Sequence, residues 1–242
     1  MAWNVAIGVV VIIFVVAIVV ARSGGSANGG GGPPRAANPD TGEPGDHWHT
    51  YLGVNICGQW LPPVPAFEQP VGSPAGTQAA GIHSHGDGLI HTHPYVESEE
   101  GTNATVGKYA HYGGWSVSSD SIDAWAAPKG APNQKSWSNG DTCTFGPYKG
   151  KKGQIVWAVD NKPRTGNPSD YQQQDGTTVA IGFLPKDTKL DFPPDACNAF
   201  ANISDQQTAA VVSKDSPCRE QVATTTTQVP ASTEPPSTTL AP

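Results

Sequence analysis

The sequence has little methionine and little positive charge. Met1 is its one methionine, and 14 Lys and Arg residues are outnumbered by 21 Asp and Glu residues, which gives a formal net charge of -7. Because proteins bind nucleic acid through clustered Lys and Arg, this balance predicts no nucleic-acid partner. The densest basic run, Lys149, Lys151 and Lys152, lies in a Gly-rich turn and is interpreted as solvated. The single methionine also excludes the thioether ligand of blue-copper and Cu(I) sites.

Cysteine is scarce as well, with four residues and no C-x-x-C pair. An even number of cysteines without that spacing is typical of two disulfides formed in an oxidising compartment. Cys197 and Cys218 enclose a segment that favours a short helix in need of a covalent link, so we expect these two to pair. By elimination, Cys57 is expected to pair with Cys143.

An uninterrupted run of apolar and small residues occupies positions 5–21, and no Lys or Arg precedes it. Its length is near the lower limit of about 17 residues for a membrane-spanning helix. A cleaved signal peptide would have a basic start and a shorter apolar stretch, so an uncleaved anchor is favoured over cleavage at 19–21. Arg22 alone would draw the following chain toward the cytoplasm, whereas the expected disulfides favour the other side. We therefore expect a single-pass protein of the cell membrane with an extracytoplasmic domain.

Composition divides the rest of the chain. The stretch after the anchor is rich in Gly, Pro, Asn and Ser and cannot bury enough apolar surface to become ordered, and the last residues form a Thr/Ser/Pro tract typical of disordered stalks. The expected organisation is a transmembrane anchor at 1–22, a disordered Gly/Pro linker at 23–45, a His-rich β domain at 46–194, a disulfide-linked satellite at 195–220 and a disordered tail at 221–242.

Hydrophobic periodicity predicts strands for most of the domain. Apolar residues alternate with polar ones over 48–56, and stronger apolar runs follow at 154–159 and 177–184. A short helix is expected over 104–112, with Asn103 or Thr102 as its cap. The predicted fold class is therefore α+β and β-rich: a single compact, mostly antiparallel β domain with one or two short helices, following the N-terminal transmembrane helix.

The most specific pattern is GIHSHGDGLIHTHP at residues 81–94, which contains two H-x-H pairs. Side chains at i and i+2 of a strand leave the same face. A three-residue loop at 86–88 would place His83 opposite His91 and all four imidazoles on one face, with Ile82 and Ile90 on the other. A two-residue loop would put the pairs on opposite faces, because a one-residue slip inverts a strand. The apolar face favours the three-residue loop.

The seven histidines all lie between positions 47 and 111, and His47 and His49 form a third H-x-H pair. Scattered structural histidines would explain any one pair, but such clustering favours neutral imidazole donors to a cation. The predicted metal ligands are His83, His85, His91 and His93, together with His47 or His49. Asp87, Glu97 and Glu100 are close enough in sequence to orient imidazoles. Copper or zinc is the preferred transition metal ion, with Ni(II) or Fe(II) as alternatives.

Several motifs together resemble an uncharacterised actinobacterial family of membrane-anchored proteins. They are DHWH at 46–49, Cys57, the Leu61-Pro62 pair, GIHSHGDGLIHTHP at 81–94 and NATVG at 103–107. The resemblance covers roughly 46–194 and implies a short N-terminal anchor and these domain limits. It implies no activity, and the chain after residue 195 has no counterpart in it.

Two known metal motifs are similar in part. The run from His91 to Pro94 is similar to the H-x-H-P of JAMM-type zinc isopeptidases, but Thr102 and Thr105 stand where that motif has its Ser and its Asp ligand, so Glu97, Glu99 or Glu100 would have to replace the Asp. The cupin pattern also begins with H-x-H, but it needs a further His beyond position 111, and this chain has none.

The sequence thus favours a module that sequesters or delivers a metal ion, because many imidazoles and no placed catalytic carboxylate would saturate the ion. A metal-dependent enzyme, cupin-like or a JAMM-like hydrolase without the usual Asp, is the alternative. The expected partners are the membrane, through residues 5–21, and the metal ion. The sequence indicates no particular protein partner or substrate.

Overall fold

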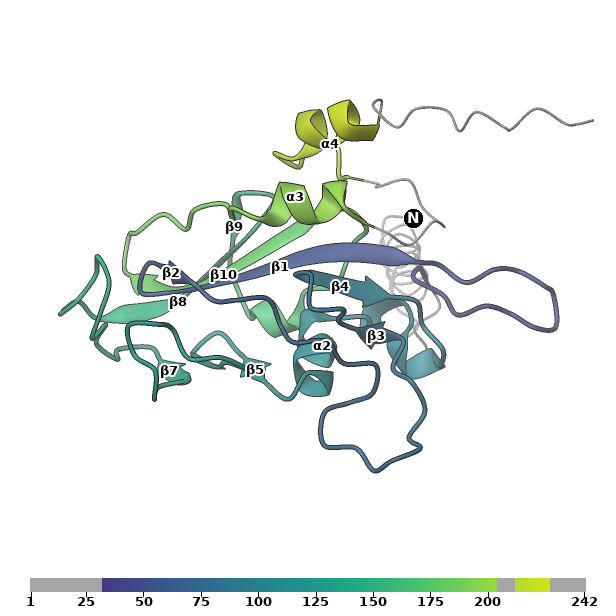
Figure 1. Ribbon diagram of the computed structural model, residues 1–242, viewed down its shortest axis with the longest axis horizontal. Coiled ribbons are helices and arrows are strands. Elements are labelled where there is room, and N and C mark those ends of the chain that lie inside the picture. Colours follow the sequence, from purple (N-terminus) through teal and green to yellow (C-terminus); the bar gives the residue numbers. More distant parts are fainter. Residues whose placement is uncertain (1–31, 204–211, 227–242) are drawn as a thin grey trace, which may run out of the picture.

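A computed structural model describes residues 32–203 and 212–226 (Figure 1). Its strands are β1 (Trp48–Ile56), β2 (Gln59–Trp60), β3 (Ile82–His83), β4 (Leu89–Thr92), β5 (Ser116–Val117), β6 (Ser121–Asp123), β7 (Ser136–Ser138), β8 (Gly153–Val159), β9 (Lys162–Arg164) and β10 (Thr178–Pro185). The helices are η1 (Glu97–Glu99), η2 (Gly101–Asn103), α2 (Val106–Tyr112), η3 (Pro168–Asp170), α3 (Ala196–Ala201) and α4 (Arg219–Thr226).

Most strands belong to one seven-stranded sheet, in the order β3-β4-β1-β10-β8-β9, with β2 paired to β1. Strands β1 and β10 run parallel, and the other described pairs in this sheet are antiparallel. A separate three-stranded sheet has the order β5-β6-β7. The prediction of a β-rich, mostly antiparallel domain with short helices is therefore confirmed for the described residues.

The two central strands form because their sequences can be buried on both faces. All eight residues of β10 are buried, as expected for a strand in the middle of a covered sheet. In β1 the alternation sends Leu52, Val54 and Ile56 to one face, where they join the main core. The strands predicted at 154–159 and 177–184 correspond to β8 and β10.

Both faces of the large sheet are covered, as Figure 1 shows. The main core packs between one face and the elements α2, β5, β6 and β7. On the other face, Phe200 of α3 and Val222 of α4 pack with Tyr51 and Leu89. Full burial of a Phe side chain is worth about 2 to 3 kcal/mol, so the satellite contributes to the stability of the domain that it covers.

The predicted short helix is α2, but the predicted cap is wrong. Thr105 is the N-cap residue, and its side chain accepts a hydrogen bond from the Lys108 amide. Thr102 and Asn103 instead lie inside η2, a 3₁₀ turn that ends before the helix begins. The cap is therefore shifted along the chain by the extra turn.

Part of the stretch before Asp46 is hydrogen-bonded to the domain. The amide of Arg35 donates to the Asp46 side chain, and the Asp46 amide donates back to the Arg35 carbonyl. The Pro34 carbonyl accepts from Gly101 at η2. Ordered structure thus begins before Asp46, inside the stretch for which composition predicts a disordered linker. At the other end, α4 runs past residue 220, into the predicted tail.

The anchor predicted at residues 5–21 lies outside the described residues. Among those that are described, no helix combines the length and the apolar character needed to cross a bilayer.

Both predicted disulfides are confirmed. Cys57 pairs with Cys143 and Cys197 pairs with Cys218, and the described residues include no free cysteine. The first bond joins the end of β1 to the loop before β8 within the main core. The second joins α3 to the start of α4.

Replacing Cys57 and Cys143 by Ala should lower the free energy of unfolding by about 4 to 5 kcal/mol, because the bond closes a long loop and so restricts the unfolded chain. The sequence separation is 86 for this bond and 21 for the other. Replacing Cys197 and Cys218 should therefore cost less, about 3 kcal/mol. Urea unfolding of the three oxidised proteins, followed by Trp fluorescence, measures both losses. A larger loss for the second pair would contradict the loop-length argument.

Candidate metal centre

The hairpin of β3 and β4 has the register that the three-residue loop predicts. His83 is the direct partner of His91, and Ile82 and Ile90 are fully buried in the main core on the opposite face. Gly86 and Gly88 have φ values of +83° and +88°, which suit glycine. Asp87, between them, accepts a hydrogen bond from the Leu89 amide and so closes the turn.

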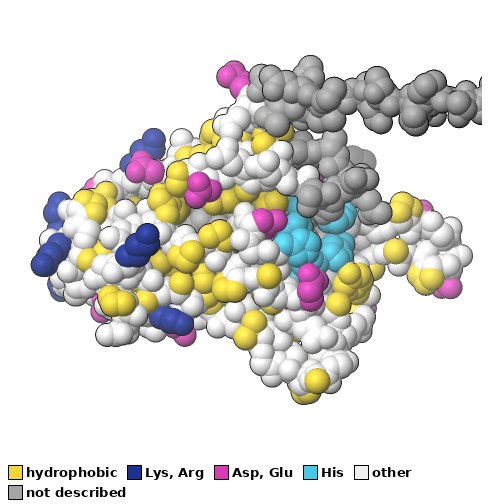
Figure 2. Space-filling view, in the orientation of Figure 1, with side chains coloured by type: hydrophobic (Ala, Val, Ile, Leu, Met, Phe, Trp, Pro, Cys, Tyr) yellow, Lys and Arg dark blue, Asp and Glu magenta, His cyan; other side chains and the backbone are white. Residues whose placement is uncertain are grey.

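Strand β1 adds the third histidine pair. His49 is the direct partner of His91, so the alternation of β1 brings His47 and His49 to the face that carries the other imidazoles. The six rings form a continuous cluster, and histidine side chains make one patch on the face of the molecule that Figure 2 shows. Ring centroids lie 4.9 Å apart for His47–His49, His47–His93 and His49–His91, 4.5 Å for His83–His93, 5.0 Å for His83–His85, 5.7 Å for His83–His91 and 4.0 Å for His85–His91.

The base of the hairpin is fixed by a buried carboxylate. Glu99 of η1 accepts hydrogen bonds from the amides of Gly81 and Tyr95, each at 3.0 Å, and so joins the two ends of the hairpin. The His93 amide donates to the Gly81 carbonyl at 2.8 Å. A Cβ atom on Gly81 would lie 2.7 Å from the Cα of Pro94, so glycine is required for this close approach.

Two further carboxylates hold the histidines of the inner strands. Asp87 Oδ2 lies 3.0 Å from His91 Nε2, and because a carboxylate only accepts, neutral His91 donates from Nε2 and has its lone pair on Nδ1. Burial alone would raise the pKa of Asp87, but the hydrogen bond and charge of His91 hold it below its usual range. Asp175 accepts from the His49 amide at 2.8 Å, and burial raises the pKa of Asp175 to about 6.

His83 has a fixed orientation too. Its Nδ1 lies 3.0 Å from the Ala80 carbonyl, so neutral His83 carries its proton on Nδ1 and turns the lone pair of Nε2 toward the cluster. That nitrogen is 3.1 Å from His85 Nε2 and 3.8 Å from a carboxylate oxygen of Glu68. A histidine tautomer set in this way, by a hydrogen bond on its other nitrogen, is the usual arrangement of metal-bound imidazole.

Burial and crowding keep part of the cluster uncharged. Burial lowers the pKa of His83, and although Glu68 acts in the opposite direction, the neighbouring His91 and His85 add to the lowering. For His93, burial followed by the charges of His83 and His47 lowers the pKa to about 4. Neutral imidazole is the form that binds a cation, so these shifts favour the binding form at neutral pH.

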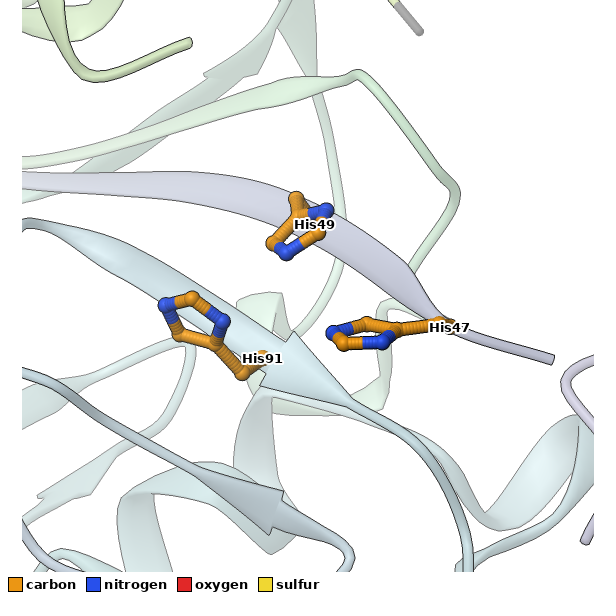
Figure 3. Close-up of side chains that lie close together, drawn as sticks. All are labelled: His47, His49 and His91. Atoms are coloured by element: carbon orange, nitrogen blue, oxygen red, sulfur yellow. The ribbon is translucent and has the colours of Figure 1, made fainter. Parts of the chain in front are cut away.

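Three groups of ligand atoms are close enough to hold an ion. They are His47, His49 and His91; Glu68, His83 and His85; and His85, Asp87 and His91, and in each group the atoms lie within 4.8 Å of one another. Figure 3 shows the rings of the first group converging on a common space beside β1 and β4. All six predicted histidines are thus brought into one cluster. His93 is the one that belongs to none of the three groups, although its ring contacts two of the others.

Sequence reasoning missed Glu68, because it lies in a Pro-rich loop with no pattern of its own. Its neighbour Phe67 forms an isolated β-bridge with Ser84, which carries Glu68 to within 3.3 Å of His85 Nε2. Asp87 contacts an imidazole as predicted, but Glu97 and Glu100 do not. Glu97 is exposed, and Glu100 accepts from the Ala36 amide.

The seventh histidine, His111, is exposed on α2, where its ring contacts the ring of Tyr112. It offers an internal control for experiments on the cluster.

Comparisons of this chain with protein-family models, with curated protein sequences and with solved structures found no match. The assignment of a function therefore depends on the geometry of the cluster.

Replacing Glu99 by Gln should lower the free energy of unfolding by about 2 kcal/mol. The Glu99 carboxylate accepts from two backbone N–H groups, whereas the side-chain amide of Gln has only one oxygen. One buried N–H group would therefore be left without its acceptor. Glu97→Gln, at an exposed position in the same turn, is the matched control and should change stability by less than about 0.5 kcal/mol. Urea unfolding of both variants tests this, and equal midpoints would contradict the role of Glu99.

Neutral His93 should make the free energy of unfolding fall between pH 7 and pH 5, against the opposite contribution of Asp175, whose raised pKa lets the folded chain bind a proton in this range. The unfolded chain has His pKa values near 6.5, whereas that of folded His93 is about 4, so the unfolded chain binds more protons between these values. The contribution of neutral His93 is complete above about pH 6.5 and is lost as the pH falls toward 4. Urea midpoints across this range should be less pH-dependent in His93→Gln than in wild type, with His111→Gln as the control. An identical pH dependence in all three proteins would contradict this assignment.

Proposed function

We propose that this domain binds a first-row transition metal ion through its histidine cluster and sequesters or delivers that ion. The observation that carries the proposal is that His49 and His91, from two paired strands, and His47, directly before β1, place imidazole nitrogens within 4.8 Å of one another. Binding would draw the three atoms in to the roughly 3.4 Å that a tetrahedral site with bonds of about 2.1 Å requires.

Rigidity supports this proposal. The ligands lie in or directly beside strands whose opposite face is buried core. Asp87 fixes the ring of His91, and Asp175 fixes the backbone of His49. A pre-ordered set of donors loses little conformational entropy when the ion binds. His93, with its ring 4.9 Å from that of His47, is placed to add a fourth imidazole.

The donor set favours Cu(II) or Zn(II), with Ni(II) or Fe(II) as further candidates. Imidazole suits all four ions, whereas Ca²⁺ and Mg²⁺ take oxygen ligands. The four cysteines are in disulfides and the one methionine is Met1, so neither thiolate nor thioether competes for the ion.

We also propose that the domain is held at the extracytoplasmic side of a cell membrane. Two disulfides support an oxidising compartment, and the apolar run at 5–21 supports an anchor. The resemblance of the histidine motifs to a membrane-anchored actinobacterial family agrees with this placement.

A second candidate function is a metal-dependent enzyme, and one observation favours it. A cavity of about 390 Å³, within the size range of small-molecule pockets, lies against His47 and His93 and is also lined by Asp46 and Tyr95. The JAMM-like form of this alternative is weakened, because Glu99 is buried with its oxygens on backbone amides and Glu100 binds Ala36. The cupin-like form is weakened by the open seven-stranded sheet, since cupins are two-sheeted jelly rolls.

Wild-type full chain without an affinity tag should bind Zn(II) and Cu(II) tightly, and His91→Ala should weaken binding by about 100-fold or more, because it removes a ligand from the centre of the cluster. Asp87→Asn should weaken it by about 10-fold to 100-fold by releasing the ring of His91. His111→Ala should bind as wild type does. Titration calorimetry with a competing chelator, after elemental analysis, gives these affinities. Equal and weak binding by wild type and His91→Ala would refute the proposal.

Pulsed EPR of the wild-type protein loaded with Cu(II) distinguishes a storage site from a catalytic site. With one equivalent of Cu(II), a site saturated by imidazoles should give no pulsed-EPR coupling to exchangeable water protons. A coordinated water at this ion would instead favour the enzyme, since catalytic sites keep an open position.

A further inference from the structure

Two of the three groups of ligand atoms have no residue in common and differ in their surroundings, and the third group, His85, Asp87 and His91, takes one histidine from each of them. The inner group is His47, His49 and His91, in which His49 and His91 are each only 3% exposed. The outer group is Glu68, His83 and His85, in which the Glu68 and His85 side chains are 64% and 47% exposed. The inner group has imidazole nitrogens alone, and the outer group adds a carboxylate.

The outer group already has the spacing of a ligand set. The Nε2 atoms of His83 and His85 lie 3.1 Å apart, and the oxygens of Glu68 lie 3.3 Å from His85 Nε2 and 3.8 Å from His83 Nε2. Ligand atoms around a tetrahedral ion with bonds of about 2.1 Å are about 3.4 Å apart. The bond from His83 Nδ1 to Ala80 leaves the Nε2 lone pair of neutral His83 facing this group.

One ion cannot use all of these donors. Six imidazoles and Glu68 make seven ligand groups, whereas imidazole-bound first-row ions take about four to six ligands. His91 lies between the two groups. Because its Nε2 donates to Asp87, its lone pair on Nδ1 is directed away from Asp87, and the ring lies 4.0 Å from that of His85 and 4.9 Å from that of His49.

We propose that the cluster is a centre for two divalent transition metal ions, an inner ion held by His47, His49 and His91 and an outer ion held by Glu68, His83 and His85. This inference rests on the proposed metal-binding function and extends it. His93, whose ring contacts those of His47 and His83, lies between the two ions.

The two ions differ in how firmly they are held. Two of the inner ligands, His49 and His91, are buried on paired strands, and the third, His47, directly precedes β1, so their donors are ordered before binding. The outer ion depends on Glu68 and His85, whose exposed side chains must be immobilised when the ion binds. The outer ion therefore exchanges with solution, and the inner ion is retained.

The test uses the full oxidised chain and Zn(II) as the probe. Wild type should bind about two equivalents, with the second one removed first by a competing chelator. The double variant Glu68→Gln with His85→Ala changes only exposed side chains and should bind one equivalent, with the affinity of the tight step unchanged within about threefold. His49→Gln should lose the tight step and retain the weaker one. His111→Ala should still bind two, and thermal unfolding of each apoprotein checks that the variants fold.

Loading with Cu(II) gives an independent readout. Two neighbouring Cu(II) ions should produce dipolar broadening and a half-field EPR signal in wild type, and the double variant should give the spectrum of an isolated ion. Two results would overturn the two-ion centre while leaving metal binding in place. In the first, wild type binds only one equivalent of metal ion, and the double variant binds it equally well. In the second, wild type binds only one equivalent, and both the double variant and His49→Gln lose it. An absence of Zn(II) and Cu(II) binding would overturn the proposed function itself.

Discussion

The register of three neighbouring strands is the constraint on which the candidate site depends. His83, His91 and His49 are partners across the β3–β4 and β4–β1 ladders, so their side chains share one face of the sheet. A shift of one residue would turn the imidazoles of the shifted strand to the opposite face and bring Ile82 or Ile90 out of the core. Because both isoleucines are fully buried, hydrophobic burial on one face maintains the imidazole cluster on the other.

The cluster carries an electrostatic cost that the surrounding residues reduce but do not remove. Protonated imidazoles at these spacings would repel one another, and burial holds His83 and His93 in the neutral form. Asp87 and Glu68 add negative charge beside the rings. Neutral imidazoles crowded together still leave several lone pairs facing each other. A divalent cation accepts such lone pairs, and this is the physical reason for which we propose metal binding.

Local patterns predicted much of this arrangement. The alternation in β1, the apolar run of β10, the hairpin register and both disulfides follow from residue periodicity and from cysteine number. Contacts between segments far apart in the chain were not predicted. Composition suggested a linker before Asp46, but Arg35 and Pro34 are hydrogen-bonded to Asp46 and Gly101. The predicted helix cap, Asn103 or Thr102, is wrong for a local reason, because both residues lie in η2 and Thr105 caps α2.

The sequence by itself determined which residues are able to form the site: six histidines in three H-x-H pairs, each pair confined to one face by the two-residue period of a strand. Only the tertiary structure decided which donors meet. Strand β1 pairs with β4 although β2, a long loop and β3 lie between them in the sequence. Glu68 approaches His83 and His85 because the Phe67–Ser84 bridge brings its loop to the end of β3. Glu99 and Asp175 likewise act on backbone amides distant in sequence. Periodicity cannot encode these contacts, because they depend on how segments far apart in the chain pack over a common core.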